Sequence, residues 1–195
     1  MSKKLTLIRH GKTGYSGRYI GSRDVSLSSA GRQQIEDIRS YFVNRKELKI
    51  IASPMLRCRQ SCGILFPEQK IVYDDELREV DFGRWEGLTF AEIAAKDPDY
   101  VDDWAKLSGT FCFPEGECVD AFLKRVGTVG EKITHFSEQD IIIIAHGGVI
   151  RALLCYFLKL DPSKYLLFQV EKGRFTTLNL FPEGAVLTGL NLGVK

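Results

Sequence analysis

The sequence predicts an α/β fold: a three-layer sandwich with a mostly parallel central sheet, helices on both faces and an antiparallel edge. Strand-like and helix-like segments alternate along the 195 residues, as they do in chains that form parallel sheets. The segment 141–145 is wholly apolar and rich in β-branched residues, which is typical of a central strand covered on both faces. Two late strand patterns flank Gly184, which indicates an antiparallel edge hairpin.

Short apolar segments in the first half of the chain predict three strands, over 4–9, 49–52 and 70–73. Ser28 and Ser29 are candidate N-caps for a helix that ends near Asn44. Ser53-Pro54 is expected to start the next helix, because serine is a favoured N-cap and proline fits the first helical position.

The second half of the chain continues the alternation of helices and strands. Short helices are expected near Thr89 and Pro98, and a long amphipathic helix over 118–136. A further helix follows His146-Gly147-Gly148. The last three strands are predicted near 166–170, 174–181 and 185–192.

The length of the chain indicates one globular domain over 1–195. Lys and Arg total 27 against 25 for Asp and Glu, with no block of like charges, so neither a nucleic acid nor a membrane surface is supported as a partner. No apolar run is long enough to span a membrane or to form a signal sequence. A cytoplasmic location is the default expectation, and the oligomeric state is left open.

The chain has five cysteines, which are Cys58, Cys62, Cys112, Cys118 and Cys155. Their number is odd, and the sequence has neither a C-x-x-C pair nor a histidine at zinc-ligand spacing. We therefore expect no disulfide framework and no structural zinc site. The first two thiols share a helix face with Met55 and Leu65, which favours buried core residues over metal ligands.

Residues suited to binding phosphate lie at or just beyond the ends of three predicted strands. Arg9-His10-Gly11 follows the first strand, Arg57 lies shortly after the second, and His146-Gly147-Gly148 follows the central strand. In parallel sheets the carboxyl ends of the strands meet at one edge, where ligands bind. Arginine offers a planar fork of donors that matches phosphate, and helix N-termini add unpaired N–H groups. The sequence therefore predicts a phosphoryl-binding pocket.

Several short blocks occur in a fixed order between residue 5 and about residue 155. They are Leu7 to Thr13, Gly21 to Gly31, Ser53-Pro54 with Arg57, Leu77-Arg78-Glu79 with Gly83 to Gly87, Pro114-Glu115-Gly116-Glu117, and Ala145 to Gly148. Together they resemble the histidine phosphatase superfamily, which includes the cofactor-dependent phosphoglycerate mutases. An isolated Arg-His-Gly would be a weak motif, but the ordered set is much more specific. The resemblance implies a phosphoglycerate mutase-like fold, with no metal and no cofactor.

The resemblance also implies roles for individual residues. His10 would be the nucleophile, with Arg9, Arg57 and His146 around the phosphoryl oxygens and Glu79 as the proton donor. Further phosphate or substrate contacts would come from Thr13, Ser16 and Gly147. The chemistry agrees, because a neutral imidazole can divide phosphoryl transfer into two easier displacements, and arginines can spread the transferred charge.

Each of these residues has a structural alternative. His10 could be a core histidine, and Arg57 could be a solvated helix residue. Glu79 stands in an acidic stretch, so choosing it over its neighbours rests mainly on the resemblance. Ser16 stands where the family usually has Asn, which bears on the contacts of the loop after His10.

The resemblance implies that the section between Glu79 and His146 covers the pocket. This section is shorter than in the mutases and lacks their basic segment, which favours a phosphatase. Within it, the segment 83–120 is expected to form a pocket-covering insertion. It holds nine acidic and three basic residues, a balance that would oppose a second anionic group on the substrate. Seven aromatic residues between Phe82 and Phe113 would suit a ring-bearing leaving group such as a nucleoside.

The sequence therefore favours a metal-independent phosphomonoester hydrolase that acts through phospho-His10 on a small phosphate ester. Among family branches of this length it looks most like the α-ribazole phosphatase group, which makes α-ribazole 5'-phosphate a candidate substrate. The alternatives are a phosphoglycerate mutase-type phosphotransferase, a broad-specificity sugar or nucleotide phosphatase, and a phosphate-binding module without catalysis.

Overall fold

A six-stranded sheet organises the protein, with the order β3-β2-β4-β1-β5-β6. The computed structural model describes residues 2–45, 47–106 and 110–193. The strands are β1 (Lys3–Arg9), β2 (Leu48–Ala52), β3 (Ile71–Tyr73), β4 (Asp140–Ala145), β5 (Phe175–Phe181) and β6 (Gly184–Leu192). The first four are parallel to one another, and β5 and β6 run antiparallel at one edge. The predicted fold class is therefore confirmed.

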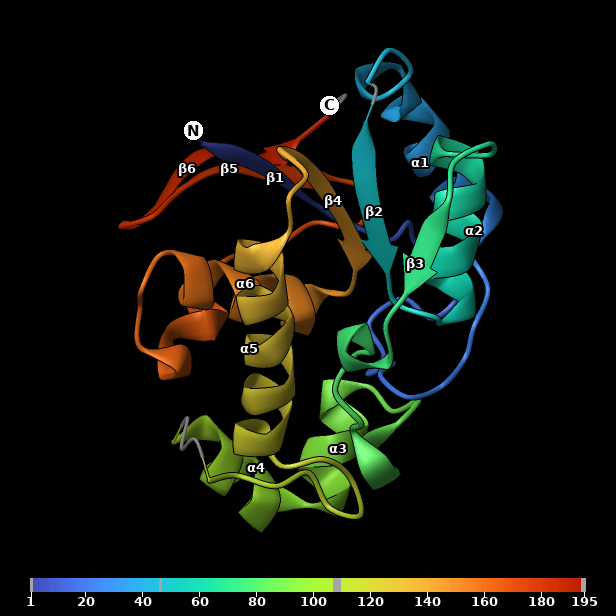
Figure 1. Cartoon of the computed structure of the whole chain (residues 1–195). Coiled ribbons are helices and arrows are strands. Elements are labelled where there is room, and N and C mark those ends of the chain that lie inside the picture. The colour runs from blue at the N-terminus through green and yellow to red at the C-terminus, as the bar shows by residue number, and fades with distance from the viewer. Residues whose placement is uncertain (1, 46, 107–109, 194–195) are drawn as a thin grey trace.

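Helices cover both faces of the sheet (Figure 1). The helices α1 (Ser29–Asp37) and α2 (Leu56–Leu65) lie on one face, and α5 (Val119–His135) and α6 (Gly147–Phe157) lie on the other. The shorter α3 (Phe90–Lys96) and α4 (Pro98–Ala105) lie near the N-terminal end of α5, away from the sheet.

The central strand β4 contributes to two hydrophobic cores, because successive side chains of a strand point to opposite faces. Ile141, Ile143 and Ala145 pack with α5 and α6 in one core. Ile142 and Ile144 pack with α1 and α2 in the other. All five side chains are fully buried, which explains the continuous apolar run in the sequence.

Local sequence signals set most helix starts where the sequence predicts them. The Ser28 hydroxyl accepts a hydrogen bond from the Gly31 amide and caps α1. Thr89 and Glu92 form a reciprocal capping box at the start of α3. Pro98 occupies the first turn of α4, where its missing N–H is not needed.

Three predictions about local structure are wrong. The helix predicted to end near Asn44 ends at Asp37, and a short 3-10 helix over Arg39–Tyr41 follows it. The helix predicted to start at Ser53-Pro54 begins at Leu56, because the Ser53 side chain is bonded to His146 and the Asp24 carboxylate caps the Leu56 amide instead. The strand predicted at 166–170 is absent. Residues Pro162–Leu167 form a 3-10 helix, which Asp161 caps by accepting from the Ser163 amide.

The expectation about the cysteines is correct for three of the five residues. Cys58, Cys62 and Cys155 are free and buried. Cys112 and Cys118, however, form a disulfide, and their backbones also form a short antiparallel bridge. The sequence shows neither contact, because the turn that brings these two residues together lies within an irregular section. Residues 107–109, next to this turn, lie outside the described residues.

We expect thiol titration in denaturant to distinguish the bonded from the free cysteines. Protein purified without reductant should show three reactive thiols, and reduction should raise the number to five. A Cys112→Ser variant is the control and should show four before and after reduction, since Cys118 is released. Five reactive thiols in the unreduced protein would contradict the disulfide.

Candidate active site

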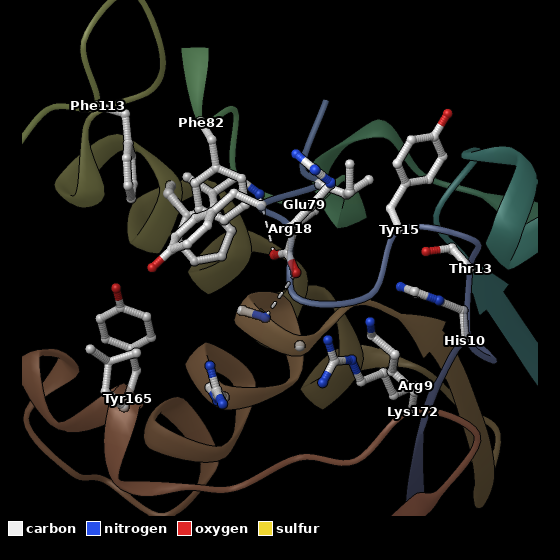
Figure 2. Close-up of a pocket in the computed structure, with 18 of the residues that line it drawn as sticks. Arg9, His10, Thr13, Tyr15, Arg18, Glu79, Phe82, Phe113, Tyr165 and Lys172 are labelled. Atoms are coloured by element: carbon white, nitrogen blue, oxygen red, sulfur yellow. Dashed lines mark hydrogen bonds between the residues drawn. The ribbon is translucent and has the colours of Figure 1, made fainter. Parts of the chain in front are cut away.

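A cavity of about 390 Å³ opens at the carboxyl edge of the sheet. The predicted residues Arg9, His10, Thr13, Arg57, Glu79 and Gly147 all line it. In Figure 2, Arg9, His10, Thr13 and Lys172 lie at one end of the cavity, and Phe82, Phe113 and Tyr165 lie at the other, with Glu79 between them. The cavity thus has a basic end and an aromatic end.

His10 lies at the basic end (Figure 2), and one of its ring nitrogens has no hydrogen-bond partner among the described residues. It is only 5% exposed, and its Nδ1 lies 2.8 Å from the carbonyl oxygen of Gly11. A carbonyl can only accept, so the proton of the neutral ring is on Nδ1 and the lone pair is on Nε2. Burial and the charges of Arg57 and Arg9 hold the pKa of His10 well below its usual value of 6.5. The ring is therefore neutral at pH 7 and nucleophilic at Nε2.

His146 is fully buried and supports Arg57 from behind. Its Nδ1 accepts a hydrogen bond from Arg57 Nε at 3.1 Å, and its Nε2 donates to the Ser53 hydroxyl at 2.8 Å. Burial, then the Arg57 charge, lowers the pKa of His146 well below 6.5, so this ring is neutral as well. His146 contacts the His10 ring edge-on at 5.1 Å between centroids, but it is not among the residues that line the cavity.

Arg57 is held by three protein acceptors. Besides His146, it donates to the carbonyl oxygens of Arg23 at 2.7 Å and Gly21 at 2.8 Å. Three of its five N–H groups are thus engaged, and two remain for a ligand. Burial lowers the pKa of this guanidinium, which is 1% exposed. The arrangement positions a cation whose charge the protein compensates only in part.

Arg9 approaches the start of α6 closely. Its Nη1 donates to the Val170 carbonyl oxygen at 2.6 Å, while its buried Nε has no partner among the described residues. A Cβ at Gly147 would lie 3.0 Å from the Arg9 Cζ, so glycine there allows this contact. An unpaired buried N–H of this kind is costly, and a bound anion would satisfy it.

Glu79 is the acidic residue among those that line the cavity. Its Oε2 accepts a hydrogen bond from the Gly148 amide at 3.1 Å, in the first turn of α6. A Cβ at Gly148 would lie 2.5 Å from the Glu79 Oε1, so a side chain there would displace the carboxyl group from its present position. The carboxyl group is thus fixed opposite the basic end.

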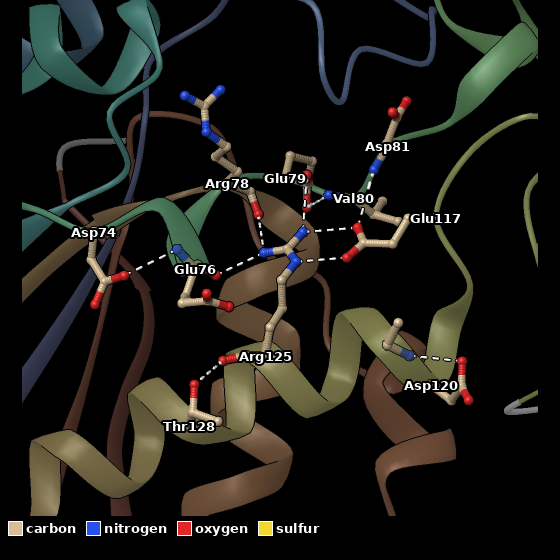
Figure 3. A network of polar contacts seen from close by, with 11 residues as sticks. Asp74, Glu76, Arg78, Glu79, Val80, Asp81, Glu117, Asp120, Arg125 and Thr128 are labelled. Carbon is tan, nitrogen blue, oxygen red and sulfur yellow. Dashed lines mark hydrogen bonds and ion pairs between the residues drawn. The ribbon is translucent and has the colours of Figure 1, made fainter.

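Arg125 of α5 holds the segment that presents Glu79 (Figure 3). Its guanidinium forms a bidentate ion pair with Glu117, at 2.6 and 2.9 Å. It also donates to the carbonyl oxygens of Glu76, Arg78 and Glu79 at 2.7, 2.7 and 3.2 Å. The sequence shows Arg125 only as one basic residue on a helix, and none of these partners can be inferred from spacing.

Ser16 is not placed as predicted. It is exposed and is not among the residues that line the cavity, whereas its loop contributes Tyr15, Gly17 and Arg18. Helical spacing could have identified Arg151, because it stands four residues after Gly147 on α6 and lines the same cavity. No sequence signal marks Lys172, which reaches the site from the irregular segment before β5.

The nine acidic residues of section 83–120 do not face the cavity, since none of them lines it. Asp97 pairs with Arg84, Glu92 with Arg18 and Glu117 with Arg125. Glu86 accepts from the amides of Gly21 and Ser22. The argument that this section repels a second anionic group is therefore wrong. Its aromatic residues do reach the cavity, and Phe82, Trp104 and Phe113 line it.

Within residues 2–45, 47–106 and 110–193, no group of three His, Cys, Asp or Glu side chains could hold a metal ion. In the same ranges no helix has the length and apolar character needed to cross a membrane.

Comparison with known sequences shows the family to which the chain belongs. A model of the histidine phosphatase superfamily (branch 1) matches residues 5–193. Phosphoserine phosphatase 1 of Hydrogenobacter thermophilus is 26% identical over 97% of this chain and 92% of that protein. Glucosyl-3-phosphoglycerate phosphatase of Mycobacterium tuberculosis is 31% identical over 84% of this chain and 79% of its own length.

Comparison of the structures agrees at the level of the fold. The crystal structure of the alpha-ribazole phosphatase from Shigella flexneri matches with a TM-score of 0.89, over 98% of this chain and 99% of that one. The two sequences are 23% identical. This likeness concerns the arrangement of strands and helices.

We expect an Arg125→Met variant to loosen the segment that carries Glu79. Losing the bidentate pair and three carbonyl contacts should cost about 2–3 kcal/mol, which lowers the melting temperature by roughly 5 °C. Hydrogen exchange of the amides between residues 76 and 81 should accelerate. Lys124→Met, an exposed neighbour on the same helix, is the matched control. Unchanged exchange in the Arg125 variant would contradict the positioning role.

The buried neutral histidines should make stability depend on pH. His10 and His146 take up protons near pH 6.5 when unfolded but not when folded, because both folded pKa values are lowered. Stability should therefore be full above pH 6.5 and fall as the pH drops, by about 1.4 kcal/mol per pH unit for each histidine. Urea unfolding between about pH 7.5 and pH 5 measures this slope. A His10→Gln variant should lose about half of it, and an equal slope in the two proteins would refute the assignment.

Proposed function

Because this chain belongs to branch 1 of the histidine phosphatase superfamily, we propose that it is a metal-independent phosphomonoester hydrolase acting through phospho-His10. The single observation that carries the proposal is the state of His10. Its Nε2 lone pair is free in a cavity lined by Arg9 and Arg57, because Nδ1 is bonded to the Gly11 carbonyl. The substrate is a small phosphate ester that enters from the aromatic end.

In the first step, His10 Nε2 attacks phosphorus and the bond from phosphorus to the ester oxygen breaks. Glu79, in its protonated form, gives its proton to the departing oxygen, so an alcohol leaves and Nε2 carries the phosphoryl group. The unpaired Nε of Arg9 and the two remaining N–H groups of Arg57 bind the phosphoryl oxygens. These groups are in place before reaction, so they stabilise the developing charge without rearranging.

In the second step, water enters from the side that the alcohol has left. The Glu79 carboxylate removes a proton from the water, whose oxygen attacks phosphorus as the bond from phosphorus to Nε2 breaks. Inorganic phosphate leaves, and His10 returns to its neutral state with the proton still on Nδ1. Glu79 is protonated again, which completes the cycle.

His146 has an indirect role in this scheme. The family resemblance assigns it a contact with the phosphoryl group, but both of its ring nitrogens are bonded to protein. A direct contact would require the Ser53 bond to break. We therefore assign His146 to positioning Arg57, whose Nε it binds.

A substrate with a ring is one candidate. The aromatic end of the cavity and the fold likeness to an alpha-ribazole phosphatase support α-ribazole 5'-phosphate. The names of the sequence relatives support phosphoserine and glucosyl-3-phosphoglycerate instead. A mutase remains the second function, because the acidic section does not face the cavity and so does not exclude a second anionic group.

Rapid quenching tests the phosphohistidine directly. With a labelled ester, the wild-type protein should yield a phosphoenzyme that is labile in acid and stable in base, and EDTA should leave turnover unchanged. His10→Ala should fold but form no phosphoenzyme and lose turnover by at least about a thousandfold. His135→Ala, a histidine exposed on α5, is the control and should behave as wild type.

Turnover retained in His10→Ala would overturn the proposal. Interconversion of 2- and 3-phosphoglycerate in a coupled assay would instead identify a mutase. A panel of esters that includes α-ribazole phosphate, phosphoserine, nucleotides and sugar phosphates would rank the substrates.

A further inference from the structure

Arg151 is a cation of the cavity that the chemistry at His10 does not use and that forms no ion pair within the described residues. Arg151 lines the cavity from α6, one helical turn after Gly147. Its Nε donates to the Phe168 carbonyl at 2.7 Å. Within residues 2–45, 47–106 and 110–193 it has no ion pair, and the four N–H bonds on its terminal nitrogens have no protein acceptor.

Arg151 lines the same cavity as Arg9 of the basic end and Tyr165 of the aromatic end. Its charge contributes to the lowered pKa of Arg9, after the larger effect of burial. It also acts on the pKa of Tyr165, where burial is again the main effect.

Two more cationic residues, Arg18 and Lys172, line the cavity, and each has a partner or a position at the basic end. Arg18 pairs with Glu92 at 3.0 Å and also donates to the Gly87 carbonyl. Lys172 lies beside Arg9 at the basic end (Figure 2), where burial and the Arg9 charge lower its pKa. Lys172 thus adds to the phosphoryl subsite, and Arg151 is left with an unmatched charge.

We propose that Arg151 binds a carboxylate on the substrate, so that the natural substrate is a phosphate ester with a carboxylate near the phosphate and an apolar or aromatic remainder. This inference rests on the proposed phosphatase function and defines its substrate class. Residues four apart on a helix are separated by about 6 Å, a span that the two anionic groups of such a compound can bridge. A single guanidinium matches the shape and unit charge of one carboxylate.

In the structure, no carboxylate of section 83–120 lines the cavity to repel a second anionic group on the substrate. Among the residues that line the cavity, the acid is Glu79, and its carboxyl group is held by the Gly148 amide. The acidic residues of section 83–120 do not line the cavity, and Asp97 and Glu117 among them form ion pairs with Arg84 and Arg125. The aromatic residues Phe82, Phe113 and Tyr165 would pack against the remainder of the substrate.

Matched pairs of esters test the proposal. The pairs are 3-phosphoglycerate with glycerol 3-phosphate, and 3-carboxyphenyl phosphate with phenyl phosphate, so that each pair differs in the carboxylate. In wild-type protein the carboxylate member should have at least about a tenfold higher kcat/KM, mainly through a lower KM. Equal values within both pairs would overturn the proposal without the use of any variant.

Variants then assign the preference to Arg151. Arg151→Met should reduce the ratio within each pair to about one, and Arg151→Lys should restore part of it, because the charge is kept but the fork is lost. Arg32→Met, an exposed arginine of α1, is the control and should keep the wild-type ratio. A preference that survives in Arg151→Met would refute the assignment, and thermal unfolding shows whether that variant is folded.

The outcome also separates this inference from the proposed function. Hydrolysis of phenyl phosphate through phospho-His10 with no carboxylate preference would disprove only the role of Arg151. Absence of a phosphoenzyme with every ester would disprove the phosphatase mechanism itself.

Discussion

The parallel pairing of β1 with β4 is the constraint on which the site depends. Arg9 is opposite Ala145 in the register, so the two strands end at the same level and deliver their next residues to one point. The His10 amide continues the ladder by donating to the Ala145 carbonyl at 3.1 Å. A shift of one residue would exchange the two faces of the strand and bury a different set of side chains. The two hydrophobic cores therefore enforce the position of His10 beside His146.

Gly147 and Gly148, which follow β4, allow close contacts at the start of α6. A Cβ at Gly147 would crowd Arg9, and a Cβ at Gly148 would collide with Glu79. The start of α6 can thus lie against a cation and a carboxyl group at once. Because the α6 backbone makes these contacts, the packing of the helix on the sheet positions Arg9 and Glu79 relative to each other.

The sheet, the main helices and most of the basic end could be predicted from sequence because their signals are local. Apolar runs and N-cap residues mark the elements, and the ends of parallel strands must meet. The capping of α2 by Asp24 and the bonding of Ser53 to His146 could not be predicted, since each joins residues far apart in the chain. The disulfide was missed for a different reason: its two cysteines lie in a turn without periodicity.

The net charge of a chain segment does not predict the electrostatic field inside the cavity. Section 83–120 is strongly acidic, yet its carboxylates do not line the cavity, and Asp97, Glu92, Glu117 and Glu86 are bonded to Arg84, Arg18, Arg125 and the Gly21 amide. An ion pair with good geometry cancels most of its own field at a distance, so paired acids contribute little to the interior. The potential in the cavity is decided by the charges left without a partner. Among the described residues that line the cavity, the cations Arg9, Arg57, Arg151 and Lys172 form no ion pair, and they outnumber the single acid Glu79.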